Sequence, residues 1–340
     1  MLREALFYKN LPDGQVICSL CSHNCHIKPG QRGLCQVREN QAGTLMSLVW
    51  GRPITLAVDP IEKKPLFHFL PSSLSFSLAT LGCNFQCAFC QNWQISQATP
   101  EYKREDEVIV APEEVIKLTL ANNCKSISYT YTEPTVYFEY AADCMEQAQK
   151  AGLANVFVSN GFQSEACLAS CKGLLQAANV DLKSFRDKFY REVCRARLAP
   201  VLDSLRLLKT AGTWLEITTL LIPGKNDESV ELKELAQFIA QELSTDVPWH
   251  VSAYRPHYKY AGKGPSSTPP RTLLKAQEIG LEAGLHHVYI GNAPGLGGED
   301  TICPQCETLL LRRMGFAVKE NNLRNGACPT CGRSVAGVWQ

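Results

Sequence analysis

Apolar residues in the middle of the chain fall into short runs that alternate with longer stretches of helical spacing. The short runs are rich in β-branched and aromatic residues, which is typical of buried strands. We predict seven strands, at Leu74–Thr80, Ser126–Thr130, Asn155–Ser159, Val180–Lys183, Trp214–Leu221, His250–Tyr254 and His287–Ile290. The stretches between them predict helices over 112–121, 136–151, 200–211, 227–243 and 271–283.

Strands that alternate with helices favour a parallel sheet. We therefore expect an α/β protein with a partial (β/α)6 TIM-type barrel, an N-terminal Cys-rich extension and a C-terminal zinc-ribbon-like knuckle. The expected units are residues 1–73 for the extension and a strap, 74–292 for the core barrel, and 293–340 for a four-cysteine tail. In such barrels the chemistry gathers at the carboxyl ends of the strands.

The strap lies within residues 41–73. It carries three prolines, at Pro60, Pro65 and Pro71, which exclude a regular helix. We expect an extended segment whose lysines lie on a solvated face. His68 is more simply a packing histidine than a ligand, although the strap ends just before a cysteine-rich loop and could bring His68 near it.

Composition and charge limit the classes of partner that the protein could bind. The chain has 34 Lys and Arg against 33 Asp and Glu, without the basic stripe of a nucleic-acid-binding protein. No run approaches the roughly 20 apolar residues of a membrane span, and Met1 to Asn10 is too short and charged for a leader. Sixteen cysteines are unusual. We expect a cytoplasmic protein, in which clustered cysteines bind metal rather than form disulfides.

The loop from Gly82 to Trp93 has the spacing C-x3-C-x2-C, with Cys83, Cys87 and Cys90 directly after the first predicted strand. Three thiolates on one short loop can hold three irons of a 4Fe–4S cluster and leave the fourth iron open. A molecule with an amino group and a carboxylate, such as S-adenosylmethionine (SAM), can chelate that iron. The alternative is a zinc loop. Phe89 could cover an adenine face.

A second group, Cys18, Cys21, Cys25 and Cys35, lies in a stretch with few apolar residues. Small segments without a core often fold around a metal. We expect a four-ligand site there, with zinc favoured over an iron–sulfur cluster and unligated thiols as the alternative. His23 and His26 lie between these cysteines, so the ligand set stays open.

The tail contains two C-P-x-C knuckles about 20 residues apart, a spacing that suits a tetrahedral zinc site with a structural role. A rubredoxin-like iron is the second candidate. The four ligands are Cys303, Cys306, Cys328 and Cys331. The remaining cysteines are treated as small buried hydrophobic residues without an assigned role; they are Cys124, Cys144, Cys167, Cys171 and Cys194.

The cysteine loop and the strand ends together resemble the radical SAM enzymes. Tyr131-Thr132-Glu133-Pro134 is similar to the Gly-Gly-Glu-Pro motif that follows their second strand, with both glycines replaced. The resemblance implies that Thr132, Glu133 and Pro134 hold the amino group of SAM. The alternative interpretation, which does not use the resemblance, is that Glu133 is an ordinary acidic residue at a helix N-terminus.

Later segments resemble the branch that activates glycyl-radical enzymes. By that resemblance Asn160, Asp181 and Lys183 surround the SAM carboxylate and ribose, Ile222 flanks the adenine, and His257 touches SAM. Val158 departs from the branch, which has an acid there for a monovalent cation, so that cation site is not expected here.

Residues 61–69 and 90–97 look like those of the AmmeMemoRadiSam-system radical SAM enzymes, a group similar to the pyruvate formate-lyase activating enzyme, and this likeness covers nearly the whole chain. It implies reductive cleavage of SAM to a 5′-deoxyadenosyl radical, with an electron donor such as flavodoxin or ferredoxin. The radical would take hydrogen from a glycine of a partner protein. The alternatives are a radical enzyme acting on a small molecule or another protein site, and a non-catalytic metal-binding scaffold. A wide sealed pocket under residues 41–73 would favour a small substrate.

Overall fold

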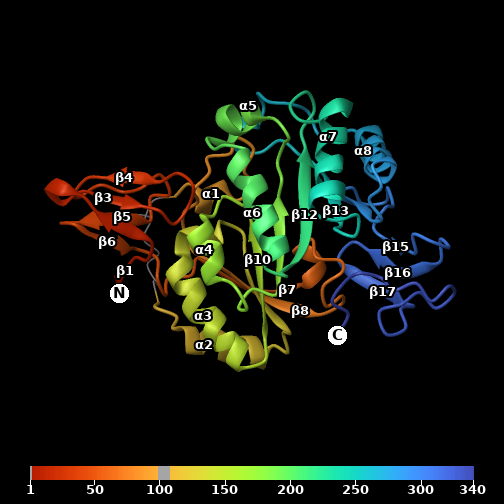
Figure 1. Ribbon diagram of the computed structural model, residues 1–340, viewed down its shortest axis with the longest axis horizontal. Coiled ribbons are helices and arrows are strands. Elements are labelled where there is room, and N and C mark those ends of the chain that lie inside the picture. The colour runs from red at the N-terminus through yellow and green to blue at the C-terminus, as the bar shows by residue number, and fades with distance from the viewer. Residues whose placement is uncertain (1, 99–107) are drawn as a thin grey trace.

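An eight-stranded sheet forms the centre of the computed structural model, which describes residues 2–98 and 108–340 (Figure 1). Seven of its strands are parallel and follow one another across the sheet in chain order. They are β8 (Leu74–Ala79), β9 (Ser126–Tyr129), β10 (Ala154–Ser159), β11 (Ala177–Asp181), β12 (Trp214–Leu221), β13 (Trp249–Ala253) and β14 (Val288–Gly291). The eighth strand, β7 (Thr55–Pro60), pairs with β8 in the antiparallel sense and forms one edge of the sheet.

The predicted α/β class and all seven predicted strands are confirmed, but the sheet has seven parallel strands where a (β/α)6 barrel has six. The seventh is β14, which pairs with β13 and leaves the sheet open between β14 and β7. The strand β7 lies in the strap and was not predicted. It ends at Pro60, and a proline is tolerated at the end of an edge strand because its missing N–H costs the sheet no interior hydrogen bond.

Five long helices correspond to the five predicted ones. They are α2 (Pro112–Ala121), α3 (Phe138–Lys150), α6 (Ala199–Thr210), α7 (Ser229–Phe238) and α8 (Pro270–Glu282). The structure adds shorter pieces that the sequence pattern did not show, α1 (Trp93–Ser96), α4 (Glu165–Ser170), α5 (Asp187–Phe189) and the π-helical turn η4 (Tyr190–Cys194). Within the described residues, the helices lack the combination of length and apolar content needed to cross a membrane.

Two small antiparallel sheets form the N-terminal extension and lie at one end of the molecule in Figure 1. One contains β2 (Tyr8–Asn10), β3 (Val16–Cys18) and β4 (Cys25–Ile27); the other contains β1 (Arg3–Glu4), β5 (Arg38–Gln41) and β6 (Thr44–Ser47). A buried ion pair fixes the extension to α3, because Arg38 Nη1 donates to both carboxylate oxygens of Glu139 at 2.8 and 3.0 Å. A bridge between Cys21 and Gln163 adds a second attachment to the barrel.

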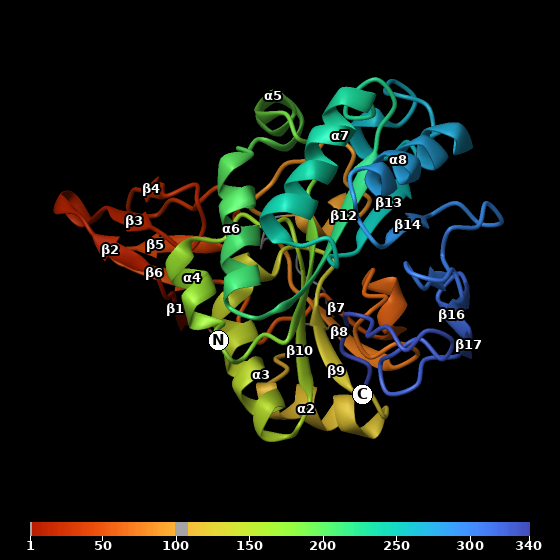
Figure 2. The ribbon, with the colours of Figure 1, turned by 45° about the vertical axis from the view of Figure 1, so that its right-hand side comes forward.

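The tail packs against the open side of the sheet, beside β14 (Figure 2). Its three strands are β15 (Thr301–Ile302), β16 (Leu309–Met314) and β17 (Ala317–Asn321). The hydroxyl groups of Tyr289 in β14 and Thr301 in β15 lie 2.8 Å apart. Near the end of the chain, the Leu70 N–H donates to the Val338 carbonyl at 2.7 Å, so the tail also pairs with the strap.

The strap enters the barrel from the end opposite the strand carboxyl ends. The carboxylate of Glu216, fully buried in β12, accepts the backbone N–H groups of Phe67 and His68 at 3.0 and 2.8 Å. His68 is fully buried, and its ring nitrogens lie 2.8 Å from the Ala336 carbonyl and 2.6 Å from the Tyr289 hydroxyl. The packing interpretation of His68 is therefore confirmed.

Candidate active site

The carboxyl ends of the parallel strands surround a cavity of about 450 Å³. The loop after β8, the ends of β9 to β13, the strap and the tail all contribute to its walls. Nine of the residues singled out from the sequence line it, namely Cys83, Cys87, Phe89, Cys90, Thr132, Glu133, Asn160, Asp181 and Lys183. The fold thus gathers them at the end of the barrel where chemistry is expected.

The cysteine loop begins against the N-terminal extension. Gly82 has a φ of +93°, and a Cβ there would lie 2.6 Å from Val37 Cγ1 and 2.8 Å from the Cys35 carbonyl oxygen. Both the backbone conformation and the close approach therefore require glycine. Directly after it, Cys83 Sγ accepts the Phe85 N–H at 3.4 Å.

The middle of the loop is held by the π-helical turn η4. The N–H groups of Gln86 and Ala88 donate to the carbonyls of Cys194 and Val193 at 2.9 and 3.0 Å. This contact places Cys194, which the sequence left without a role, beside Cys87. No signal in the sequence marks Cys194, because the two cysteines lie far apart in the chain and meet only through the fold.

The surroundings of Cys87 favour its thiolate form. A hydrogen bond with the Cys194 thiol and, more weakly, the positive charge of Lys183 lower the pKa of Cys87 although burial opposes them. The thiolate is the form that binds iron. In contrast, burial and the neighbouring Glu133 raise the pKa of Cys83, which a bound metal ion would have to overcome.

Glu133 is buried and held by several donors. Its Oε1 accepts from the Thr135 hydroxyl at 2.6 Å and the Ser159 hydroxyl at 2.8 Å, and its Oε2 accepts the Asn160 N–H at 2.8 Å. Burial raises the pKa of Glu133, and these hydrogen bonds partly offset the shift. Glu133 also caps the short helix η3 (Pro134–Tyr137), so the ordinary helix-terminal role exists beside its position in the cavity wall.

Tyr131 occupies the place of a family glycine and keeps a glycine-like conformation, with a φ of +65°. Its side chain offsets the cost of this conformation. The hydroxyl donates to Asp59 in β7, and the Lys64 ammonium lies 4.5 Å from the ring centre. Asp59 in turn accepts from Lys63 and Lys64 at 2.7 and 2.8 Å, so this end of the cavity wall is a charged network.

Asp181 and Lys183 pair with each other at the end of β11. Lys183 Nζ donates to Asp181 Oδ2 at 2.7 Å and lies 5.9 Å from the centre of the Phe89 ring. Burial alone would lower the pKa of Lys183, but the charges of Asp181 and Cys87 raise it well above its ordinary value. The lysine is therefore cationic where it faces the cavity.

A family model described as the radical SAM superfamily matches residues 77–236. The uncharacterized protein MJ0808 of Methanocaldococcus jannaschii is 43% identical over 336 residues, which cover 98% of this chain and 99% of that protein. This chain belongs to the radical SAM superfamily. Membership implies an enzyme that uses a 4Fe–4S cluster and SAM for radical chemistry.

The chain also has weaker similarities to other proteins. The uncharacterized protein MJ0674 of the same organism is 26% identical over 251 residues, covering 71% of this chain and 67% of that protein. The structure of Streptococcus suis SuiB bound to S-adenosylmethionine has a TM-score of 0.51 at 14% identity, covering 69% of this chain and 53% of that chain. The latter similarity shows the fold alone.

Three predicted SAM contacts do not line the cavity of this radical SAM protein. Pro134 and Ile222 are buried behind the wall, and His257 is exposed on the loop before η6 (Tyr258–Tyr260). At the end of β12, Leu220 lines the cavity instead of Ile222. The apolar Val158 also lines it.

The tail cysteines converge as tightly as a single metal ion requires. The sulfur atoms of Cys303, Cys306, Cys328 and Cys331 all lie within 4.8 Å of one another, with two of the pairs 3.6 Å apart. Four sulfurs around a tetrahedral zinc with bonds of about 2.3 Å stand about 3.8 Å apart. The residues therefore fit zinc, and they fit a rubredoxin-like iron equally well.

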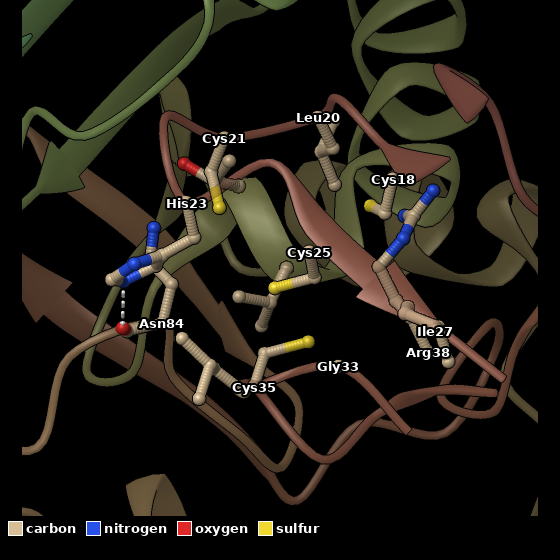
Figure 3. Close-up of a pocket in the computed structure, with 13 residues that line it drawn as sticks. Cys18, Leu20, Cys21, His23, Cys25, Ile27, Gly33, Cys35, Arg38 and Asn84 are labelled. Atoms are coloured by element: carbon tan, nitrogen blue, oxygen red, sulfur yellow. Dashed lines mark hydrogen bonds between the residues drawn. The ribbon is translucent and has the colours of Figure 1, made fainter. Parts of the chain in front are cut away.

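The N-terminal cysteines surround a small hollow between the extension and the barrel (Figure 3). Its four thiols belong to Cys18, Cys21, Cys25 and Cys35. His23 lies at its edge, 2.8 Å from the Asn84 carbonyl, whereas His26 does not line it. All sixteen cysteines of the chain are free thiols.

Proposed function

We propose that this radical SAM protein cleaves SAM reductively at a 4Fe–4S cluster held by Cys83, Cys87 and Cys90, and removes a hydrogen atom from a substrate bound in the same cavity. The observation that carries the proposal is that the three thiols line one cavity with a buried carboxyl group, Glu133, and a partly buried cationic side chain, Lys183. Three thiolates leave one iron of such a cluster without a protein ligand, and that iron is the place where SAM would bind.

When bound, the cluster and SAM supply an electron and a carbon radical that abstracts hydrogen. The chain supplies binding and position. The carboxylate of Glu133 is placed to accept an ammonium group, and the ammonium of Lys183 is placed to pair with a carboxylate. Phe89 offers a flat face for adenine, while Val158 and Leu220 keep part of the wall apolar and exclude water.

The first candidate substrate is a glycine backbone of a partner protein. The likeness of Asn160-Gly161 and of Asp181-Leu182-Lys183 to the glycyl-radical activating branch supports this role. We propose a reduced flavodoxin or ferredoxin as the electron donor, because the cleavage consumes one electron at low potential. A reducing cytoplasm would keep the sixteen thiols available for metal.

A second candidate is a small molecule or another protein site. The observation that favours it is that Lys63 and Lys64 of the strap and Phe316 of the tail line the same cavity as the cysteine loop. Both lysines pair with Asp59, so the three groups together keep one net positive charge, which would suit a compact ligand with negative charge.

The decisive experiment measures 5′-deoxyadenosine by chromatography after anaerobic reduction of the cluster-loaded protein with SAM. We expect slow formation without substrate, and none from Cys87→Ala. The absence of product from the fully loaded protein would contradict the proposal. Adding candidate partner proteins or small-molecule fractions and looking for faster formation then separates the two substrates.

We also propose that the four tail cysteines hold zinc in a structural role. Metal analysis should give about one zinc per chain, and it should disappear from Cys328→Ser but persist in Cys87→Ala. Iron without sulfide in the tail would favour the rubredoxin-like alternative.

A further inference from the structure

We propose that Cys18, Cys21, Cys25 and Cys35 hold a second 4Fe–4S cluster, ligated by all four thiolates, that relays electrons to the cluster at Cys83, Cys87 and Cys90. The relay rests on the proposed function, whereas the second cluster does not. The sequence alone favoured zinc for these cysteines; the structure supports a different cofactor.

The first argument is the spacing of the sulfur atoms. Cys18 and Cys25 face each other across the hairpin of β3 and β4, and Cys21 and Cys35 approach from the two adjoining loops (Figure 3). Within the part of the chain that the structure describes, the tail quartet is the one group of thiols packed closely enough for a single ion. The N-terminal sulfurs stand further apart around their hollow. A cubane needs a spacing wider than that of a single-ion site, because each of its thiolates binds a different iron.

The second argument is a pair of buried donors without acceptors. Arg38 Nε and Asn84 Nδ2 have no hydrogen-bond partner, and both side chains line the hollow. These residues are only 1% and 3% exposed, so bulk water does not reach them. Leaving a buried donor unpaired costs about 1–3 kcal/mol, and more for a charged group. A cluster with four thiolates is anionic, and its sulfur atoms would accept from both donors.

Arg38 is well suited to an anionic neighbour. Its Nη1 pairs with Glu139, and its Nη2 donates to the Leu6 carbonyl at 2.5 Å. These contacts fix the guanidinium beside Cys18 (Figure 3). Leu20, Ile27 and Val136 make much of the remaining wall apolar, as for a site that excludes solvent.

The third argument is the contact with the radical site. Asn84 follows Cys83 directly in the chain and lines the hollow with its side chain. Its carbonyl lies 2.8 Å from His23 Nε2, and its Oδ1 accepts from Asn160 Nδ2 at 2.7 Å. Gly82, on the other side of Cys83, is packed against the Cys35 carbonyl. The two cysteine sites are therefore adjacent, because Asn84, which lines the N-terminal hollow, is bonded directly to Cys83 of the radical site.

The electron balance is simple. An external one-electron donor of the flavodoxin or ferredoxin class reduces the second cluster by one electron, and the second cluster returns to its oxidised state when it reduces the first. No bond or proton changes at the second cluster. Leu34, beside Cys35, lines the hollow and is 51% exposed, so the hollow reaches the surface at a point where a donor can approach.

The test begins with the triple variant Cys83→Ala, Cys87→Ala, Cys90→Ala, reconstituted without oxygen. We expect about four iron and four sulfide atoms per chain in this variant and about eight of each in the wild type. We also expect electron paramagnetic resonance of a reduced 4Fe–4S cluster that does not respond to SAM. Sulfide excludes a rubredoxin-like iron in the tail as the source. Two results would overturn the proposal of a second cluster. One is a triple variant whose only metal is zinc, at two ions per chain, and the other is a triple variant without sulfide.

The relay is tested separately with Cys21→Ser. We expect this variant to form 5′-deoxyadenosine at the wild-type rate with dithionite, a small reductant that reaches the first cluster directly. With reduced flavodoxin the rate should fall at least tenfold. Equal rates with both reductants would overturn the relay. If the first cluster failed to cleave SAM in the wild type, the iron and sulfide counts of the triple variant would still decide the second cluster.

Discussion

The guanidinium carbon of Arg313 lies 4.2 Å from the ring centre of Phe67, and Arg313 Nη2 donates to the Phe67 carbonyl at 2.7 Å. This pair joins the tail to the strap at the open side of the sheet. Arg313 Nη1 also donates to the Glu299 carbonyl and the Thr301 hydroxyl, so one buried side chain joins the strap to the segment that begins the tail.

Arg313→Ala should therefore destabilise the fold. It removes a cation–π contact and leaves the buried Phe67 carbonyl without its donor, at a cost of about 2–4 kcal/mol. The neighbouring Arg312→Ala is the matched control, because Arg312 is half-exposed and pairs with Glu320 on the surface; we expect about 0–1 kcal/mol there. Denaturant unfolding measures both. Equal effects would contradict the role of Arg313 as the link.

Replacing Lys183 by Met should weaken SAM binding and leave the cluster intact. The loss of one charge-assisted contact costs about 1.5–3 kcal/mol, which is roughly 10- to 100-fold in affinity. Asp181→Asn should act in the same direction, since Asp181 orients the lysine at 2.7 Å. Lys275→Met, in an exposed pair with Glu278, is the control. Calorimetry with SAM decides the matter, and unchanged affinity in both site variants would reject their assignment.

Cys194→Ala should lower the reduction potential of the cluster at Cys87. A hydrogen bond to a ligand thiolate stabilises the more negative, reduced cluster, and the variant removes that donor. Cys171→Ala is the control, because Cys171 is equally buried and donates to the Cys167 carbonyl instead. Potentiometric titration followed by electron paramagnetic resonance measures the shift. A shift of the same size in the control would show general loosening rather than a specific contact.

Asp59→Asn should destabilise the protein at neutral pH and much less in acid. Burial alone would raise the pKa of Asp59, but hydrogen bonds from two lysines, Tyr131 and Ser77 outweigh it and hold that pKa well below its usual range. A carboxylate with a lowered pKa stabilises the fold above its ordinary pKa of about 3.9, and this contribution is lost as the pH falls below that value.

Breaking this buried network should cost about 3–5 kcal/mol at pH 7. The difference between wild type and Asp59→Asn should narrow steadily from pH 5 to pH 2 in unfolding experiments. Asp203→Asn, on an exposed pair with Arg206, should change little at either pH. A difference that is constant with pH would mean that the charge of Asp59 is unimportant.

Phe316→Ala should alter what happens to the substrate but not the cleavage of SAM alone. Phe316 is the residue of the tail that lines the cavity. Met314→Ala is the control, because Met314 lies two residues away, is 67% exposed and is not in the cavity wall. The ratio of 5′-deoxyadenosine to modified substrate should rise in Phe316→Ala alone. An unchanged ratio would remove the tail from the substrate site.

The sequence by itself determined the local features. The alternation of apolar runs and helical stretches predicted the parallel strands, because each strand buried on both faces needs a continuous apolar segment. The spacing of Cys83, Cys87 and Cys90 predicted the cluster loop, since neighbouring residues on one loop are close in any fold. The repeated C-P-x-C spacing of the tail predicted a four-cysteine group, and the fold brings the two knuckles together.

Contacts between distant segments were decided only by the tertiary structure. Three such contacts depend on how the sheet curves and on what closes its open side. They are the hydrogen bond between Cys194 and Cys87, the position of Asn84 between the two cysteine sites, and the place of Phe316 in the cavity wall. A sequence pattern records the period of burial along one element. It does not record which elements meet, because that choice is made by packing over the whole core.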